Sequence, residues 1–560
     1  MKTSLLLALL LLPQCFDSPV RDPLAKGGTT GPEHLRLRTQ DPDWRAEGMQ
    51  GAVAAGGAGS VAAGLETLKA GGNAADAAVA TLLALTITDY DQFCFGGEVP
   101  ILIYDAKRKT VEVLSGMGAA PKLATREYFE GRGGIPGRGL LCAAVPAALD
   151  ACLTALDRHG TISFADAVKP ARKLLDGQTG WRADLAHTLG RLVEAETAAA
   201  GDRSARLRAV ADFFYRGPIA TEIDAWSREG GGLLRAGDLA AHRTRIEAPL
   251  TVEYRGHTIA KCGPWTQGPW LLQALRLLEG FDLKALGHNS PEAIHLMLEA
   301  MKLAMADRDV HYGDPEFVKV PVGELLSKEY ADLRRALIDP KAASLVQRPG
   351  DPAGGKALLG EAATRSGLGP AAPNDTTTCV VADRWGNVVA ATPSGWSGVV
   401  AGRTGVWLGS RLQSFNTWKG HPNCIEPGKR PRITLTPTLV LKDGRPALAV
   451  SVAGGDAQDQ VSLQILLNHI DFALEPAESV TAPRFLTGHY TGSFLQSPPS
   501  LGSLVLQEEL GGLAAVLKER GHRVGLRPAP LWHPVAISIG PDGRLRVAGD
   551  PKARRHASAY

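Results

Sequence analysis

A stretch that runs from polar residues into a β-prone sequence, PNDTTTCVVADRWGNVV (373–389), constrains the fold more than any other part of the chain. Three threonines follow an aspartate and lead into two β-prone runs, which are separated by a tight turn around Trp385. A hairpin centred on this turn places Thr376 opposite Ser394, and the Cβ atoms of such partners lie about 4.5–5.5 Å apart. The sequence therefore predicts a β-hairpin whose open end carries two neighbouring hydroxyl groups.

A second hairpin is predicted farther along the chain, where an Asp-Gly pair at 443–444 separates two β-prone runs. Its register places Thr434 across from Ala453. The same register brings Gly454 and Gly455 to the end of the hairpin that carries Thr434. Because glycine has no side chain, two adjacent glycines allow backbone N–H groups to approach a ligand closely.

These two hairpins together provide what an N-terminal-nucleophile (Ntn) hydrolase needs. Such an enzyme cuts itself before the nucleophile, and the new α-amine, with an unperturbed pKa of about 7.7–8.0, acts as general base. Backbone donors from a glycine pair then stabilise the tetrahedral intermediate, each contributing about 10²–10³ in rate. Spacing alone also fits a purely structural interpretation, because threonine favours strands and Gly-Gly favours turns.

Length and composition favour a globular protein that acts on a small molecule. The 560 residues are 44% hydrophobic and 21% charged, which is enough to bury a large core. The formal charge of +3 comes without long basic runs, so nothing indicates nucleic acid or an anionic membrane as a partner.

The N-terminus is typical of an exported protein. Residues 1–18 contain one early lysine, a leucine-rich run and Pro13, as a secretory signal does. A leucine-rich first helix is the alternative, and the run is too short for a membrane span. We expect export to the periplasm, the cell envelope or the exterior, with 19–48 as a loose segment.

The cysteines do not form a recognisable ligand pattern. Besides Cys15, six cysteines are widely scattered, without CxxC or Cys/His spacing, so no metal site is predicted. Disulfides and buried free thiols both remain open.

The remaining pattern indicates one α/β domain and not a string of modules. Residues 346–375 are rich in Gly, Pro and Ala and are expected to form a mobile linker. Other expected elements are two helices within 62–85, broken at Gly71-Gly72 with Asn73 as a cap; a hairpin over 101–114; a mostly helical region over 145–340, with its clearest amphipathic helix at 291–309; and a buried helix over 460–474.

Several blocks of the sequence resemble the γ-glutamyltransferase (γ-glutamyltranspeptidase) family. They are AGLETLKAGGNAADAAVA (63–80), EAMKLAMADRDVHYGDPEF (299–317), DTTTCVVADRWGNVV (375–389), IEPGKRPRITLTPTLV (425–440), AGGDAQDQ (453–460), TAPRF (481–485) and GDPKARRHASAY (549–560). The resemblance implies the four-layer αββα sandwich of the Ntn hydrolases. It also implies a precursor cut between Asp375 and Thr376 into a large subunit (49–375) and a small subunit (376–560).

The resemblance assigns roles to the residues of the two hairpins. Thr376 is implied as the nucleophile, which forms an acyl-enzyme that water or an amine acceptor resolves. Ser394 is the supporting hydroxyl, and Gly454 and Gly455 are the oxyanion-hole glycines. No cofactor and no metal are implied. Cys379 is a rival nucleophile only if cleavage occurs three residues later, inside the strand.

The residues that hold glutamate in γ-glutamyl-specific members are altered here. The corresponding positions are Met117 for a carboxylate-binding arginine, Trp396 for an asparagine, Arg411 and Ser414 for an acidic pair, and Ile433-Thr434 for a serine pair. This pattern resembles the acylase and amidohydrolase branch of the family. Trp396, Arg411, Thr434 and Asp456 are therefore the candidate substrate-binding residues.

Two of these candidates keep an alternative. Arg411 binds an anionic group of the substrate or is a structural ion-pair residue. Asp456 binds an amine in the pocket or holds the glycine turn.

The resemblance implies a self-processing amidase or acyltransferase that performs γ-glutamyl transfer or glutathione hydrolysis through a threonine acyl-enzyme. The first alternative is an exported Ntn amidohydrolase or acylase that acts on a non-glutamyl amide. The second is an unprocessed, non-catalytic binding protein with the same fold.

Overall fold

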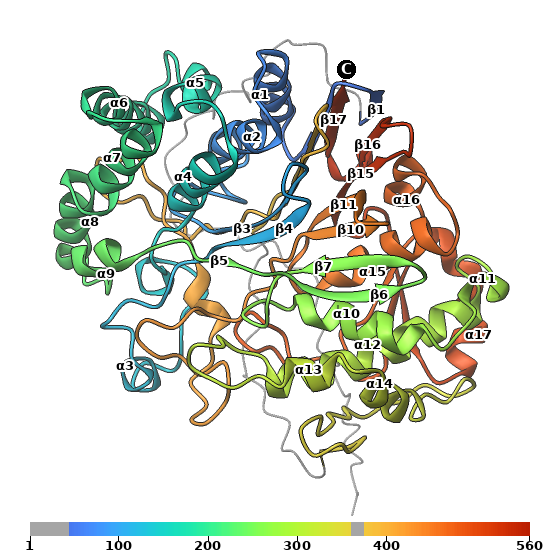
Figure 1. Cartoon of the computed structure of the whole chain (residues 1–560). Coiled ribbons are helices and arrows are strands. Elements are labelled where there is room, and N and C mark those ends of the chain that lie inside the picture. The colour runs from blue at the N-terminus through green and yellow to red at the C-terminus, as the bar shows by residue number, and fades with distance from the viewer. Residues whose placement is uncertain (1–43, 360–374) are drawn as a thin grey trace, which may run out of the picture. The chain divides into compact units, whose positions relative to one another are not determined.

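Two seven-stranded antiparallel sheets form the centre of the protein in a computed structural model that describes residues 44–359 and 375–560 (Figure 1). The first sheet has the order β1 (Arg45–Gly48), β16 (Leu545–Gly549), β15 (His533–Ile539), β11 (Arg445–Ala453), β10 (Thr438–Lys442), β7 (His257–Lys261) and β6 (Leu250–Tyr254). The second has the order β17 (His556–Ala559), β2 (Gly51–Ala55), β8 (Cys379–Asp383), β9 (Val388–Ala391), β3 (Val99–Asp105), β4 (Thr110–Gly116) and β5 (Ile246–Glu247). A small third sheet joins β12 (Phe485–Leu486), β13 (Ser503–Gln507) and β14 (Arg523–Arg527).

The two large sheets pack face to face, and helices cover their outer faces. One buried apolar cluster joins Leu102 and Val380 of the second sheet to Ala449 and Ile537 of the first. Two further apolar clusters pack the helices onto the sheets: one lies between the second sheet and its helices, and the other lies between the first sheet and its helices. Figure 1 shows α1, α2 and α4–α8 beside the second sheet and α10, α12 and α15 beside the first. The predicted four-layer αββα sandwich is confirmed.

The helices have the following bounds. They are α1 (Ala58–Lys69), α2 (Ala74–Thr88), α3 (Arg126–Glu130), α4 (Ala148–His159), α5 (Phe164–Leu174), α6 (Trp181–Ala198), α7 (Arg203–Tyr215), α8 (Pro218–Glu229), α9 (Ala236–Ala241), α10 (Gly268–Leu278), α11 (Leu283–Leu286), α12 (Pro291–His311), α13 (Val322–Leu325), α14 (Lys328–Arg335), α15 (Gln458–Ile470), α16 (Pro476–Thr481) and α17 (Ala514–Glu519). The expected helices at 62–85 and 460–474 and the hairpin of β3 and β4 are therefore confirmed. Asn73 caps α2 as predicted, because its side chain accepts from the N–H of Asp76 at 3.0 Å.

The hairpin of β8 and β9 has the predicted register. Val380 pairs with Ala390, and an isolated bridge beyond the strands joins Thr376 to Ser394. The turn therefore fixes the register of the hairpin, and Thr376 and Ser394 meet at the open end of the hairpin.

The register predicted for the second hairpin is wrong beyond its turn. A β-bulge between Val440 and Leu441 shifts the pairing by one residue, so Thr438 faces Val450. Ala453 pairs instead with His533 of β15. Thr434 lies before β10 begins and is not across from Ala453.

Helix α12 was expected to be amphipathic, but it is buried along almost its whole length, from Ala293 to Arg308. Its charged side chains are accommodated by pairing; for example, Lys302 Nζ lies 2.6 Å from Glu299 Oε1. Buried charges of this kind require partners, and those partners lie partly in distant segments that a helical period cannot reveal.

Part of the predicted linker is described, and it packs against helices of the first sheet's outer layer. Gly350 donates its N–H to Asp307 at 2.7 Å, and Arg334 donates to the carbonyl of Ala357 at 2.6 Å. The mobility predicted for 346–375 stays a prediction, and 360–374 lie outside the described residues. So do the expected signal (1–18) and most of the loose segment (19–48). Within the described ranges, no helix is long and apolar enough to cross a membrane.

Candidate active site

Two hydroxyl groups converge on the peptide bond that joins Asp375 to Thr376. Thr376 Oγ1 donates to the carbonyl oxygen of Asp375 at 2.5 Å, and Ser394 Oγ also donates to this oxygen. The two hydroxyl oxygens lie 3.1 Å apart, and both residues are buried. The bond at which the family resemblance places self-cleavage is therefore the bond that both hydroxyls contact.

Arg411 orients the supporting hydroxyl. This residue begins a short 3-10 helix, Arg411–Ser414, and its Nη2 donates to Ser394 Oγ at 2.6 Å. Because Ser394 accepts from Arg411, its own hydrogen is available for the carbonyl of Asp375. The guanidinium is fully buried. Sequence reasoning left Arg411 between two roles. The structure shows its ion pairs with Glu98 and Asp375, and its predicted contact with an anionic group of the substrate stays a prediction.

The side chain of Asp375 is held by three donors. Its Oδ2 accepts from the N–H of Trp396 at 2.7 Å and from Ser410 Oγ at 2.6 Å. Its Oδ1 lies 3.4 Å from Arg411 Nη2. Burial raises the pKa of this carboxyl, and the Arg411 charge opposes that effect. The residue before the cleavage point is thus fixed at both its carbonyl and its side chain.

Glu98 is a site residue that sequence reasoning missed. Its Oε1 accepts from Arg411 Nε at 2.5 Å, and its backbone pairs with Ser394. Burial raises the pKa of Glu98 to about 7, although Arg411 opposes the shift. A Cβ placed on Gly395 would lie 2.7 Å from Glu98 Oε2, so a glycine is required there. The sequence signal was a lone acid after two glycines, FGGE, between a helix and a strand.

Trp396 contributes its backbone to the site and its side chain to an aromatic group. Its ring lies 5.7 Å from that of Trp407, and the guanidinium of Arg138 lies 4.7 Å above it. The backbone N–H of Trp396 contacts the carboxylate of Asp375, and the predicted substrate-binding role of this residue stays a prediction.

The glycine pair forms a tight turn directly after β11. Gly454 and Gly455 have φ values of 148° and 57°, a backbone conformation that favours glycine. A hydroxyl contact of 3.0 Å joins Thr392, which directly follows β9, to Ser451 of β11. Ser394 and Gly454 follow these two residues closely in the sequence. This contact links the strand that leads to the glycine turn with the strand that leads to Ser394. The oxyanion role of the glycines stays a prediction.

Gln458 lies under this turn and engages Thr434. In the amide orientation that satisfies both its groups, its nitrogen donates to the carbonyls of Thr434 at 3.2 Å and Val452 at 3.0 Å. Its oxygen then accepts from the N–H of Gly455 at 3.3 Å. Thr434 itself is fully buried, and its predicted contact with substrate stays a prediction.

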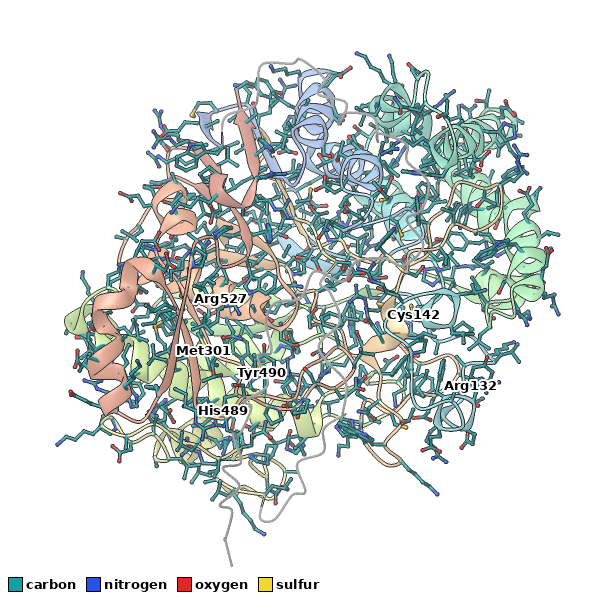
Figure 2. All side chains as sticks on the ribbon, turned by 180° about the vertical axis from the view of Figure 1, so that it is seen from behind. Arg132, Cys142, Met301, His489, Tyr490 and Arg527 are labelled. Carbon is teal, nitrogen blue, oxygen red and sulfur yellow. The ribbon has the colours of Figure 1, made fainter. Side chains whose placement is uncertain are left out.

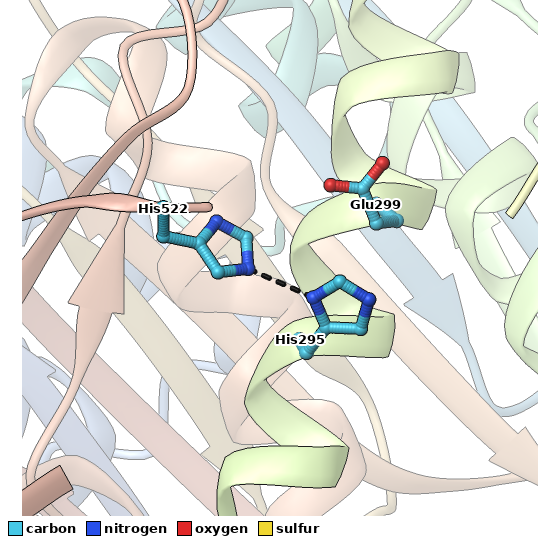
Figure 3. A group of neighbouring side chains, drawn as sticks. All are labelled: His295, Glu299 and His522. Atoms are coloured by element: carbon cyan, nitrogen blue, oxygen red, sulfur yellow. Dashed lines mark hydrogen bonds between the residues drawn. The ribbon is translucent and has the colours of Figure 1, made fainter. Parts of the chain in front are cut away.

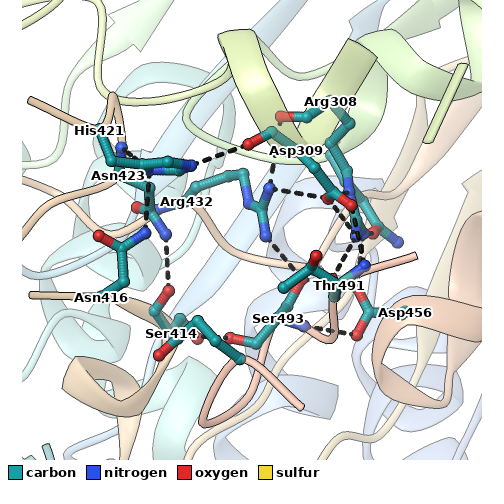
Figure 4. A network of polar contacts seen from close by, with 12 residues as sticks. Arg308, Asp309, Ser414, Asn416, His421, Asn423, Arg432, Asp456, Thr491 and Ser493 are labelled. Atoms are coloured by element: carbon teal, nitrogen blue, oxygen red, sulfur yellow. Dashed lines mark hydrogen bonds and ion pairs between the residues drawn. The ribbon is translucent and has the colours of Figure 1, made fainter. Parts of the chain in front are cut away.

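Asp456 is part of a polar network that holds the turn (Figure 4). One of its oxygens accepts from Arg308 of α12 and from the hydroxyl of Ser493, each at 2.5 Å. The other accepts from the N–H of Ser493 at 2.9 Å. These contacts favour the second of the two alternatives for Asp456, in which it holds the glycine turn.

A cavity of about 270 Å³ opens beside this network. Among the residues that the structure describes, Asp309, Asn416 and Arg432 line this cavity, and Asp456 does not. Burial and the neighbouring Arg308 lower the pKa of Arg432 to about 10. The cavity therefore has a cationic guanidinium in its wall.

The positions at which γ-glutamyl-specific members of the family hold glutamate carry apolar side chains here or already make other contacts. Met117 is buried in the apolar cluster between the sheets, together with Leu412 and Ile433. Ser414 is also buried, and its carbonyl accepts from the side chain of Asn423 at 2.7 Å. No arginine at position 117 and no acid at position 411 or 414 is available to bind a glutamyl group.

One cluster among the described residues has metal-ligand atoms close together: His295, Glu299 and His522 (Figure 3). The two imidazoles are hydrogen bonded to each other at 2.8 Å. Lys302 donates to one oxygen of Glu299 at 2.6 Å, and Arg348 donates to the other at 3.0 Å. These two cationic side chains already bind the carboxylate of Glu299 and repel a metal ion, so the three residues of the cluster do not fit a metal site. The expectation of no metal stays a prediction.

The six cysteines of the described residues are free and buried. Burial raises the pKa of the Cys142 thiol, which Figure 2 labels, to about 12. Burial also raises the pKa of Cys379, which lies within β8. A protonated thiol inside a strand is a poor nucleophile, which argues against Cys379 as the rival of Thr376.

Comparisons with known proteins agree with this geometry. The model of the family described as Gamma-glutamyltranspeptidase matches residues 60–181 and 176–560. The chain is 33% identical to the Glutathione hydrolase proenzyme of Escherichia coli (strain K12), over 90% of each chain. It is also 33% identical to the Acylase ACY 1 proenzyme of Pseudomonas sp. (strain SE83), over 90% of this chain and 92% of the relative. The crystal structure of cephalosporin acylase from Bacillus halodurans superposes with a TM-score of 0.77 at 26% identity, covering 99% of both chains.

Proposed function

Because the chain belongs to the gamma-glutamyltranspeptidase family, we propose that it is a self-processing amidase or acyltransferase whose nucleophile is Thr376. The observation that carries the proposal is the convergence of the Thr376 and Ser394 hydroxyls on the carbonyl of Asp375. A scissile carbonyl that accepts hydrogen bonds is polarised toward attack; when Thr376 Oγ1 attacks, the Ser394 hydroxyl is the donor that stays on the developing oxyanion.

Self-processing begins when Thr376 Oγ1 attacks the carbonyl carbon of Asp375. The C–N bond then breaks, the hydroxyl proton passes to the departing nitrogen, and an ester joins Asp375 to the threonine oxygen. Water hydrolyses this ester and releases the carboxylate of Asp375. The products are a large subunit that ends at Asp375 and a small subunit that begins at Thr376 with a free α-amine.

Turnover then uses the same oxygen and the new amine. The α-amine accepts the proton of Thr376 Oγ1, which attacks the substrate amide, and the leaving amine takes that proton. Water or an acceptor amine resolves the acyl-enzyme. Gly454 and Gly455 are proposed as backbone donors to the oxyanion, which is supported by their position directly after β11 and their positive φ values. For this role the N–H of Gly455 exchanges its 3.3 Å contact with Gln458 for one with the oxyanion.

The first candidate substrate is a γ-glutamyl amide, since the Escherichia coli relative is named a glutathione hydrolase. The second is a non-glutamyl amide, as the names of the two acylase relatives suggest. A specific observation favours this second candidate. Met117 is buried in apolar surroundings, and Arg411 stands where the family has an acid that binds the amino group of glutamate.

Export to the periplasm, the cell envelope or the exterior is proposed from the leucine-rich N-terminus. The alternative of an unprocessed binding protein requires that Thr376 never becomes N-terminal.

The experiment is to purify the protein, measure the intact masses of its chains and then add two chromogenic anilides, γ-glutamyl p-nitroanilide and a neutral acyl p-nitroanilide. Thr378→Val is the matched control, because this neighbouring hydroxyl is buried and has no partner among the described residues. Cleavage before Thr376 with release of either anilide supports the proposal, and the anilide that is hydrolysed identifies the substrate class. An uncut chain without activity contradicts it.

A further inference from the structure

We propose that the cavity beside Arg432 is a binding site for a small planar organic carboxylate, separate from the pocket of the nucleophile. Its volume of about 270 Å³ is close to the lower end for small-molecule sites, about 300–1,000 Å³. Among the described residues, neither Thr376 nor Ser394 lines the cavity. The inference goes beyond the proposed function and does not depend on it, because the chain already forms the cavity with the bond between Asp375 and Thr376 intact.

The guanidinium of Arg432 is buried, yet its donors are poorly satisfied. Arg432 is 5% exposed, and its Nη2 donates to Ser493 Oγ at 3.1 Å. Its Nη1 has only long contacts, 3.4 Å to the carbonyl of Arg308 and 3.5 Å to Asp309 Oδ1. Its Nε is buried and has no partner among the residues that the structure describes. Buried donors without full partners are costly, and a ligand carboxylate supplies the two acceptor oxygens that a guanidinium can bind together.

The charges in the wall favour an anion over a cation. Asp309 is the only acid that lines the cavity among the described residues. Its Oδ1 accepts from Arg308 Nη2 at 2.8 Å, and its Oδ2 accepts from the N–H of Thr491 at 2.9 Å. Lys419 also lines the cavity and is exposed, so it adds a second positive charge to that of Arg432. Two cations beside one carboxylate that is already paired attract a negatively charged ligand.

The loop that forms one side of the cavity is fixed to helix α12 (Figure 4). His421 Nε2 lies 2.8 Å from the carbonyl oxygen of Asp309, which can only accept, so this nitrogen carries the hydrogen. The other ring nitrogen, Nδ1, then accepts from Asn416 Nδ2 at 2.9 Å and from the N–H of Asn423 at 3.0 Å. Because these contacts exist before a ligand arrives, binding requires little ordering of the wall.

Apolar side chains complete the wall and select the body of the ligand. Trp418, Val310 and Pro422 line the cavity together with Arg432. The ring of Trp418 is held edge-on against that of His421, with 5.4 Å between the ring centroids. An indole ring packs well against another planar ring. A carboxylate for Arg432 and a flat apolar body for Trp418 are both present in benzoate, which is therefore the probe.

The test compares three planar compounds of nearly the same shape that differ in charge: benzoate, neutral benzamide and cationic benzamidine. Their binding to the purified full-length protein is measured by calorimetry and by ligand-observed NMR. Thr376→Ala shows whether binding needs the nucleophile. Arg432→Gln removes the buried cation, and Lys419→Gln removes the exposed one. Lys107→Gln is the matched control, because this lysine is exposed in the turn between β3 and β4 and does not line the cavity.

We expect the wild type to bind benzoate at least about tenfold more tightly than benzamide and to bind benzamidine most weakly, since hydrogen bonds between charged groups are the stronger ones. Arg432→Gln should lose about tenfold in affinity for benzoate and change little for benzamide. Lys419→Gln should lose about twofold to fivefold, because exposed charges contribute less. Lys107→Gln and Thr376→Ala should both match the wild type.

Three results would overturn the site: no saturable binding of benzoate, benzamidine binding as tightly as benzoate, or benzoate affinity that neither Arg432→Gln nor Lys419→Gln lowers. Thermal unfolding shows whether Arg432→Gln is folded, and if it is not, Lys419→Gln decides, since its side chain is exposed. Benzoate binding that is lost in Thr376→Ala would place the ligand at the nucleophile and contradict a separate site. An uncut wild-type chain contradicts the proposed function alone, because the cavity does not require cleavage.

Discussion

Replacement of Ser394 by alanine should slow self-processing without unfolding the protein. Ser394 Oγ contacts the carbonyl of Asp375, lies 3.1 Å from Thr376 Oγ1 and accepts from Arg411 at 2.6 Å. The variant removes one of the two hydroxyls that contact the carbonyl oxygen. Because charge develops on this oxygen during attack, the loss is felt mainly in the transition state.

The size of the effect follows from the number of donors that are lost. Removal of one donor to an oxyanion typically costs about 10²–10³ in rate, which corresponds to about 2.7–4 kcal/mol. The nucleophile Thr376 is still present, so processing should continue slowly. Arg411 loses one acceptor but keeps its ion pair with Glu98, so the buried guanidinium remains compensated.

The assay is the time course of chain cleavage after rapid purification, followed by gel electrophoresis and intact mass. Thr378→Val serves as the control, because it removes a buried hydroxyl only two residues from the scissile bond and should process at the wild-type rate. Cleavage of Ser394→Ala within about threefold of wild type would refute the role of this hydroxyl. Equal slowing of Thr378→Val would show that the effect is not specific to the site.

Three further predictions concern the groups around the nucleophile. The folded-state pKa of Glu98 is raised to about 7. The wild type should therefore lose stability relative to Glu98→Gln as the pH rises from about 4.5 to 7. A difference in unfolding free energy between these two proteins that stays constant with pH would contradict this. Asp456→Asn breaks a buried ion pair with Arg308 and should lower the free energy of unfolding, measured in urea, by about 3 kcal/mol. This value is at the low end for such pairs, because the carboxylate of Asp309 remains beside Arg308. Gly454→Ala places a Cβ 2.6 Å from the ring of Trp532 at a φ of 148°, so thermal unfolding and anilide assays should show reduced stability and activity.

The first hairpin could be predicted from the sequence because its register is local. A short turn around Trp385 sets the pairing, and every pair from the turn to Thr376 and Ser394 follows from it. The second hairpin has an equally clear turn, yet its register shifts at a bulge. That bulge lies in strands that also pair with β7 and β15, and such tertiary constraints are not encoded in the turn.

The polar part of the site could be predicted only in outline. The sequence identified Arg411 but not its role, because its partner Glu98 lies 313 residues away in the chain. Asp456 was ambiguous for the same reason, since Arg308 is 148 residues distant. Long-range ion pairs of this kind depend on how the layers pack, and neither periodicity nor a local motif reports them.

The most direct test of self-processing at Thr376 is the intact mass and N-terminal sequence of the purified wild-type protein beside Thr376→Ala. We expect two wild-type chains, the smaller beginning at Thr376, and a single inactive chain for the variant. An uncut wild-type chain that hydrolyses an amide, or a Thr376→Ala protein that is cut and active, would contradict it.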